Sequence, residues 1–416
     1  MSTAHDELLG VDEARARMLD AVAPLADETV PLVEAAGRAL AAELRALRSL
    51  PGFDNSAMDG VGVRVADVTG ASDAAPVTLR LVGEALAGGA AATASLAGGE
   101  AVRIMTGAAI PPGVEAVVMR EHTDERDVER GLIHVKAAAP AGQHVRRVGE
   151  DVRQGGVVGR AGDVITPARL NLVLAAGHVS ARVVRRPMVA VLASGDELCE
   201  VGAPLDERAV INSNAHAIAA AVRAAGGEAR LLGIARDSLA DHVAHIREAA
   251  FADVLLTVGG VSMGTHDFVR PALAEVGCTL SLWRVAMRPG KPVAFGTSDG
   301  GSARYVVGLP GNPVSAMVGF ELFVRPALRK LLGVSSPWTR PLHWATLAEG
   351  TKKKAGLEHW ARARVTRADG ALIATLLDAQ GSHQISGLAD ADALVRLPRA
   401  ATTLAAGERV EAMLLD

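Results

Sequence analysis

Apolar runs of strand length alternate with segments of helical periodicity between residues 186 and 336. Continuous apolar runs, such as 188–192 and 253–258, are typical of strands buried on both faces of a sheet. Further strands are expected at 229–232, 281–285 and 304–307, separated by helices at 213–225, 238–250, 267–275 and 313–332. Strands that alternate with helices in this way predict an α/β domain with a mostly parallel sheet.

The segments on either side of this domain have β-type patterns. Period-two alternation predicts strands at 77–82, 116–120, 132–136, 342–347, 361–365, 371–376, 393–397 and 409–414. We therefore expect a multidomain protein with a β-rich domain at 51–150 and a small C-terminal β domain at 337–416.

Helical periodicity also appears outside the α/β domain. Apolar residues at three- and four-residue steps predict helices at 11–25, with Asp12 as the N-cap, and at 33–47. A third helix is expected at 167–176, because Pro167 suits a first turn and Gly177 follows the predicted end.

The composition limits the class of protein. A chain of 416 residues predicts about two to four domains. The net charge of −4 argues against a nucleic-acid-binding protein. The two cysteines, Cys199 and Cys278, have no zinc-binding spacing. Residues 1–10 lack the basic start and apolar run typical of a signal peptide, and no run of about 18 apolar residues is present, so we expect a cytoplasmic protein without membrane contact.

Ligands of open α/β sheets bind at the carboxyl ends of the strands. Four loops that follow predicted strands are rich in glycine or acidic residues, at 194–197, 236–237, 259–267 and 308–313. Glycines bring backbone N–H groups close to an anion, and helix N-termini add partial positive charge. The residues expected to hold a phosphate-bearing anion are Ser194, Gly259, Gly260, Ser262, Gly264, Pro310, Gly311, Asn312, Pro313 and Ser315.

Charged residues accompany these loops. Glu197, Asp237 and Asp267 offer ligands for Mg²⁺, which binds one or two carboxylates together with phosphate oxygens. A helix cap is an equally good interpretation of Asp267 alone. The cations of 284–292, which are Arg284, Arg288 and Lys291, are interpreted as anion clamps rather than as solvated charges. Walker A, GxGxxG and HExxH motifs are absent.

Two further polar stretches have weaker signals. The loop 51–60 contains the turn formers Asn55 and Asp59, and a structural turn explains it as well as a site does. Ser382 and His383 are predicted to lie in a plain turn rather than to face the cleft.

Taken together, the motifs resemble the molybdopterin molybdenumtransferase family, the MoeA-type molybdenum insertases that include the E domain of gephyrin. The resemblance covers most of the chain. It rests on PGFDNSAMDG at 51–60, RIMTGAAIPPG at 103–113, GED at 149–151, SGDEL at 194–198, GGVSMGTHDF at 259–268, MRPGKP at 287–292 and GLPGNPVSA at 308–316. So many long motifs in the same order argue against chance similarity.

The resemblance implies four domains. Residues 1–50 and 151–185 would form a discontinuous linker domain, 51–150 a β-rich insertion, 186–336 the α/β molybdopterin-binding domain and 337–416 a β-barrel. It also implies a homodimer in which Asp59 and Thr106 of one subunit reach the α/β domain of the other.

The implied reaction inserts molybdenum from molybdate into adenylylated molybdopterin, requires Mg²⁺ and releases AMP. The implied catalytic residues are Asp59, Thr106, Glu197, Asp237, Asp267 and Lys291. The carboxylates of 197, 237 and 267 would position Mg²⁺ or the attacking oxygen, and the cations of 284–291 would hold molybdate or the adenylate. Molybdopterin adenylyltransferase is the implied functional partner.

One departure from the family concerns Arg284 and Arg288, where lysine is common, so a role that needs a neutral amine is in doubt there. Two alternatives remain open. A nucleotide-processing hydrolase would explain the glycine loops but not the motifs at 51–60 and 103–113. A scaffold protein, like gephyrin at receptors, would need a receptor-binding extension, and no segment of this sequence resembles one.

Overall fold

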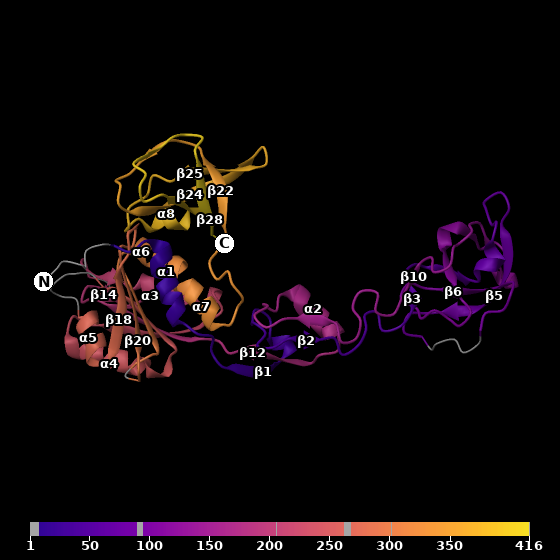
Figure 1. Cartoon of the computed structure of the whole chain (residues 1–416), viewed down its shortest axis with the longest axis horizontal. Helices are drawn as coiled ribbons and strands as arrows, with labels where there is room; N and C mark the ends of the chain where they lie inside the picture. The colour runs from indigo at the N-terminus through magenta and orange to yellow at the C-terminus, as the bar shows by residue number, and fades with distance from the viewer. Residues whose placement is uncertain (1–7, 90–94, 205, 262–267, 301, 416) are drawn as a thin grey trace.

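The computed structural model describes residues 8–89, 95–204, 206–261, 268–300 and 302–415. The molecule is elongated, with the α/β domain and the C-terminal barrel at one end and the β-rich domain at the other (Figure 1). A slender middle part connects the two ends. In these ranges no helix has the length and apolar character needed to cross a membrane.

Six strands form the sheet of the α/β domain. Their order is β16 (Glu228–Ala235), β13 (Met188–Ser194), β17 (Val254–Val258), β21 (Tyr305–Leu309), β20 (Pro292–Ser298) and β18 (Cys278–Arg284). The first four are parallel, whereas β20 runs antiparallel to both neighbours. The predicted, mostly parallel sheet is confirmed. No strand was expected at β20, because the preceding Pro289-Gly290 and Pro292 itself favour a turn.

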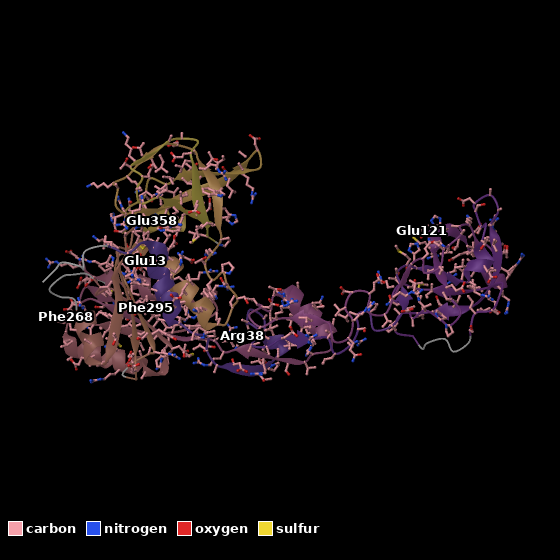
Figure 2. All side chains as sticks on the ribbon, viewed as in Figure 1. Glu13, Arg38, Glu121, Phe268, Phe295 and Glu358 are labelled. Atoms are coloured by element: carbon pink, nitrogen blue, oxygen red, sulfur yellow. The ribbon has the colours of Figure 1, made fainter. Side chains whose placement is uncertain are left out.

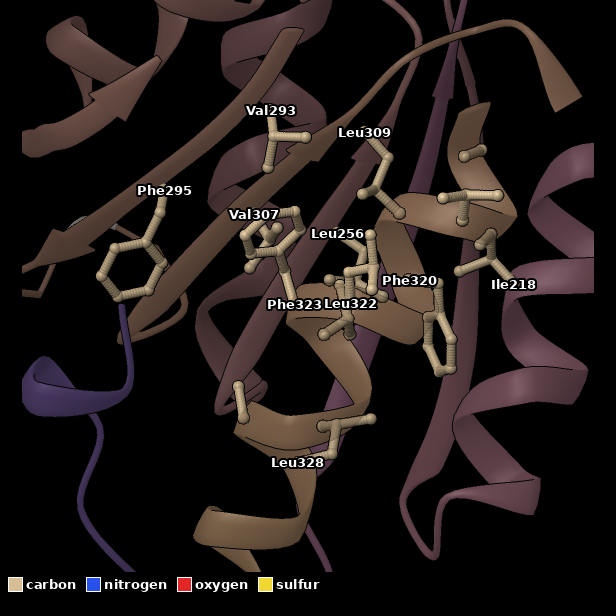
Figure 3. Packing of buried hydrophobic residues seen from close by; sticks show 14 of the residues in the cluster. Ile218, Leu256, Val293, Phe295, Val307, Leu309, Phe320, Leu322, Phe323 and Leu328 are labelled. Atoms are coloured by element: carbon tan, nitrogen blue, oxygen red, sulfur yellow. The ribbon is translucent and has the colours of Figure 1, made fainter. Parts of the chain in front are cut away.

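Helices cover both faces of this sheet. α3 (Ser213–Ala224) and the last helix pack on one face, and α4 (Leu239–Glu248) and α5 (Val269–Glu275) pack on the other. Phe295, Phe320 and Phe323 are among the largest fully buried side chains of the first face (Figure 3). The predicted helix 313–332 is present as α6 (Pro313–Gly319), a π-helical segment (Phe320–Val324) and α7 (Arg325–Leu331).

The first helix, α1 (Val11–Ala21), also packs on the α/β domain. Its apolar face, formed by Val11, Ala14 and Met18, belongs to the same core as the last helix. Although residues 1–50 are predicted to belong to the linker domain, this helix contributes to the core of the α/β domain. Gly10 rather than Asp12 is the N-cap, and the helix ends before Pro24.

Two chain segments run side by side through the middle part. β1 (Asp27–Pro31) pairs with β12 (Ser180–Val184), and β2 (Leu44–Arg45) pairs with β11 (Val157–Gly159). The helix α2 (Pro167–Ala175) packs on the shared core. The chain therefore crosses this part once on the way to the β-rich domain and once on the way back.

The predicted helix at 33–47 is wrong. Only Leu32–Glu34 form a single 3-10 turn, and Gly37 then adopts a φ of 78°. Ala39 and Leu40 form β-bridges to Val164 and Val183 instead. Tertiary pairing with the returning segment therefore overrides the helical periodicity.

Helix α2 has the predicted first-turn proline, and Thr166 caps it by accepting a hydrogen bond from the N–H of Arg169 at 3.2 Å. We expect Thr166→Ala to lower the free energy of unfolding by about 1 kcal/mol, because it leaves a helix N–H without its acceptor. Thr166→Ser, which keeps the hydroxyl, should be close to wild type. Urea denaturation measures both; equal losses would show that the methyl group, not the cap, matters.

Both β domains contain the predicted strands. The β-rich sheet has the order β7 (Ala116–Met119), β4 (Gly60–Val63), β6 (Glu100–Ile104), β5 (Val77–Ala85), β9 (Leu132–Val135) and β8 (Thr123–Asp124). The C-terminal sheet contains β24 (Glu358–Ala368), β25 (Ala371–Leu376), β22 (Leu342–Leu347), β28 (Arg409–Leu414) and β26 (Ala393–Leu397). Pairing of β24 with β26 closes it into a barrel.

Candidate functional site

The predicted site residues of the α/β domain gather at one edge of its sheet. Ser194, Asp237, Gly259 and Pro310 end or follow the four parallel strands. β18 runs in the same direction as β21, since each is antiparallel to β20, so Arg284 ends at this edge too. Ser262, Gly264 and Asp267 lie outside the described residues.

A first cavity of about 280 Å³ opens at this edge. Predicted residues on its walls are Ser194, Glu197, Gly311, Asn312 and Pro313. The start of α3 supplies three more that were not predicted, Asn212, Ser213 and Asn214. Asn212 caps this helix, and Asn214 Nδ2 donates to the carbonyl oxygen of Gly311 at 2.6 Å. The cap-forming sequence Asn-Ser-Asn was the available signal.

Arg236 belongs to the predicted 236–237 loop but was not itself a predicted site residue. It holds the loop that contains Glu197. Its Nη1 donates to the carbonyl oxygens of Asp196 and Leu198, each at 3.1 Å. The N–H of Asp237 donates to Asp196 Oδ1 at 3.1 Å. Two neighbouring loops are thereby tied together, and the backbone is held on both sides of Glu197.

The glycines of the 259–260 loop are required by close packing. Gly259 and Gly260 have φ values of 96° and 63°, which side-chain-bearing residues rarely adopt. A Cβ at Gly260 would lie 2.4 Å from Val269 Cγ2 and 3.2 Å from Ser194 Oγ. The loop therefore brings its backbone directly against Ser194.

A second cavity, also of about 280 Å³, shares Asn312 with the first. The α/β domain lines it with Arg288, Lys291 and Ser315, and the barrel lines it with Leu357, Gln380 and Ser382. The segment 380–383 is a turn, as predicted, but Ser382 lies on a cavity wall and its carbonyl oxygen accepts from Val314 N–H at 3.1 Å.

Two buried barrel residues support this second cavity. Arg362 donates through Nε to Ala379 O at 2.9 Å and through Nη2 to Gly381 O at 3.2 Å, which fixes the turn. His359 pairs with Arg288 across strands β24 and β19 (Met287–Arg288). Burial lowers the pKa of His359 to about 4, and the charges of Arg288, Arg362 and Lys353 act in the same direction.

Some predicted residues reach the edge without lining a cavity. Among the described residues, the walls of these two cavities do not include Gly259, Gly260, Pro310, Asp237 or Arg284. Arg284 is half-buried at the end of β18. Its predicted role as an anion clamp therefore has less support than the roles of Arg288 and Lys291.

Asp59 and Thr106 lie together in the β-rich domain. Asp59 Oδ1 accepts from both the N–H and the hydroxyl of Thr106, at 2.7 Å each. The backbone hydrogen bond, followed by the hydroxyl, lowers the pKa of Asp59. Both residues are exposed, and in the same chain their domain is remote from the two cavities (Figures 1 and 2).

Comparison with known proteins agrees with this architecture. Family models match residues 9–177 as "MoeA N-terminal region (domain I and II)", 190–330 as "Probable molybdopterin binding domain" and 345–415 as "MoeA C-terminal region (domain IV)". The chain belongs to the MoeA family.

Individual relatives span nearly the whole chain. Molybdopterin molybdenumtransferase 2 of Mycobacterium tuberculosis is 38% identical over 95% of this chain and 96% of its own. Molybdopterin molybdenumtransferase of Haemophilus influenzae is 35% identical over 97% and 98%. The crystal structure of the molybdopterin biosynthesis MoeA protein of Pyrococcus horikoshii matches 98% of this chain and 100% of that one, with a TM-score of 0.82 and 27% identity.

Proposed function

We propose that this protein is a molybdopterin molybdenumtransferase that inserts molybdenum from molybdate into adenylylated molybdopterin and releases AMP. The observation that carries this proposal is the adjacency of two chemically different cavities. One has a carboxylate and a helix N-terminus, the other has two cations, and Asn312 lies between them. Such a pair suits a large phosphate-bearing ligand beside a small oxyanion.

The first cavity suits the adenylylated pterin. The N-terminus of α3 offers partial positive charge, and Gly311 and Asn312 offer backbone N–H groups, on the walls of this cavity, which suits phosphate. The carboxylate of Glu197 is a hard oxygen ligand on the cavity wall, which fits Mg²⁺, an ion held by one or two carboxylates plus phosphate oxygens. When bound there, Mg²⁺ would neutralise phosphate charge, and Asp237, on the loop tied to that of Glu197, is expected to assist.

The second cavity suits molybdate. Arg288 offers a planar set of donors, Lys291 a point charge, and Ser315 and Ser382 lie beside them. The protein supplies position and charge rather than a covalent intermediate, so its main contribution is to hold the two substrates side by side.

We further propose that the working unit is a homodimer. Asp59 and Thr106 are exposed and remote from the cavities of their own chain, so a second subunit is needed to bring them to the site. Asp59 would then face the adenylate from the partner, as the family resemblance implies. Delivery of the adenylate by molybdopterin adenylyltransferase, in the cytoplasm, completes the proposal.

The direct test incubates the purified protein with adenylylated molybdopterin, molybdate and Mg²⁺ and measures AMP. Lys291→Ala should raise the KM for molybdate by about 30-fold, because a charge-assisted contact is lost, and should leave the KM for the adenylate almost unchanged. Lys352, exposed on the barrel strand β23 (Thr351–Lys352), gives the control Lys352→Ala, expected to match wild type. If the wild type releases no AMP, the proposed function is wrong; if Lys291→Ala affects only the adenylate KM, the cavities are assigned in the wrong order.

A further inference from the structure

Ser194 lines the first cavity, and its hydroxyl contacts a buried histidine to which the proposed reaction assigns no role. His242 is on α4 and only 1% exposed. Its Nε2 lies 2.8 Å from Ser194 Oγ, and its Nδ1 lies 2.9 Å from the carbonyl oxygen of Ser238. The ring of Phe268, 5.9 Å away between centroids, lies beside it.

These two distances fix where the protons lie. A carbonyl oxygen has no proton to donate, so the hydrogen bond to Ser238 requires a proton on Nδ1 of His242. A neutral imidazole has only one ring N–H, and Nε2 is then an acceptor. With the neutral ring, the hydroxyl proton of Ser194 points inward, to Nε2 of His242, and only the lone pairs of Oγ remain available to the cavity.

We propose that His242 is a positioning residue that makes Ser194 a hydrogen-bond acceptor toward the cavity, so that this corner selects a donor, an N–H group of the pterin, rather than a phosphate oxygen. The inference rests on the proposed function, and it reverses the expectation that Ser194 helps to hold phosphate. Phosphate binding would then depend on the backbone N–H groups of Gly311 and Asn312 and on the N-terminus of α3.

A serine paired with a histidine also resembles a nucleophile with its general base. The orienting partner of His242 is a backbone carbonyl, however, and not the carboxylate that would stabilise an imidazolium during proton transfer. The arrangement fixes a tautomer, and we assign it to recognition.

The same helix contains a matched control. His245 Nδ1 lies 2.9 Å from the carbonyl oxygen of Asp241, the same contact one turn further along, but His245 has no role at Ser194. Substitution of either histidine removes one side-chain contact to a helix carbonyl. Only substitution of His242 releases the hydroxyl of Ser194.

The experiment measures the dissociation constant of molybdopterin, and separately of AMP, for full-length protein. Ser194→Ala and His242→Phe should each weaken molybdopterin binding by about fivefold to tenfold, the worth of one hydrogen bond, and leave AMP binding unchanged. The double variant should be no weaker than Ser194→Ala, because both changes remove one interaction. His242→Gln, whose amide oxygen can accept from Ser194, should recover part of the affinity, and His245→Phe should match wild type.

A second readout needs no substrate. Nitrogen NMR of the free protein, with the His242 signals assigned by their loss in His242→Phe, should show the Nδ1-protonated neutral tautomer. An Nε2-protonated tautomer, unchanged molybdopterin affinity in His242→Phe, or labelling of Ser194 by a fluorophosphonate would overturn the inference. Absence of AMP release by the wild type would instead contradict the proposed function, while the tautomer and the molybdopterin affinities still decide the role of His242.

Discussion

Asp59→Asn is expected to lower the rate of AMP release by about a thousandfold, the typical cost of removing a preorganised electrostatic group. Two hydrogen bonds from Thr106, the backbone one foremost, lower the pKa of Asp59, so it is a carboxylate at any working pH. Asparagine retains an oxygen that accepts from Thr106 and loses only the charge. Asp67→Asn is the control, because Asp67 also accepts a backbone N–H, from Gly99 at 3.1 Å, in the same domain.

The proposed composite site gives this prediction a sharper form. Mixed dimers of Asp59→Asn and Glu197→Gln subunits contain one site with both changes and one site with neither. Random reassociation of the two inactive proteins should therefore restore about a quarter of wild-type activity, as two-fold symmetry dictates. If activity does not return although mixed dimers form, Asp59 acts on the site of its own chain.

Acidification should destabilise the barrel through His359. Its folded pKa is about 4, against about 6.5 in an unfolded chain. Above pH 6.5 both states are neutral and stability is complete; as the pH falls from 6.5 to 4, the unfolded chain takes up a proton first. The loss should reach about 3 kcal/mol near pH 4. Nε2 of His359 has no hydrogen-bond partner among the described residues, so a proton there would be poorly solvated.

The test compares the slope of stability against pH rather than its absolute value. Urea denaturation of His359→Gln, followed by tryptophan fluorescence, should lack the decline between pH 6.5 and 4. His343→Gln replaces an exposed histidine of the same barrel and should keep it. If the two variants lose stability equally on acidification, His359 is not the group that titrates.

Much of the α/β domain could be predicted, because its strands are buried on both faces and leave continuous apolar runs such as 188–192. Because ligands bind at the carboxyl ends of parallel strands, the sequence also predicts that Ser194, Glu197 and Asn312 share one site. The strand β20 was missed because its first residue is Pro292 and the turn-forming pair Pro289-Gly290 lies just before it. The false helix at 33–47 shows that periodicity alone does not detect pairing with a segment more than a hundred residues away.

The rest of the site depends on neighbours that no local pattern reveals. Ser382 reaches the second cavity only because the barrel packs on α6, and nothing in Gln380-Gly-Ser-His383 distinguishes it from an ordinary turn. In the sequence, His242 resembles any core histidine on a helix. Only its 2.8 Å contact with Ser194 indicates a role at the site. Sequence motifs therefore identify candidate site residues, but contacts between distant segments determine which of them share a cavity.

The paired segments of the middle part have a practical consequence. The N–H of Leu50 donates to the carbonyl oxygen of Val152 at 2.7 Å, so the chain enters and leaves the β-rich domain at adjacent points. The β-rich domain is therefore an insertion whose first and last residues are adjacent, and domains with adjacent ends are the ones that other proteins accept as insertions. We therefore expect that residues 51–151 can be exchanged between relatives as one unit, which would transfer the Asp59 loop and leave the residues of both cavities in place.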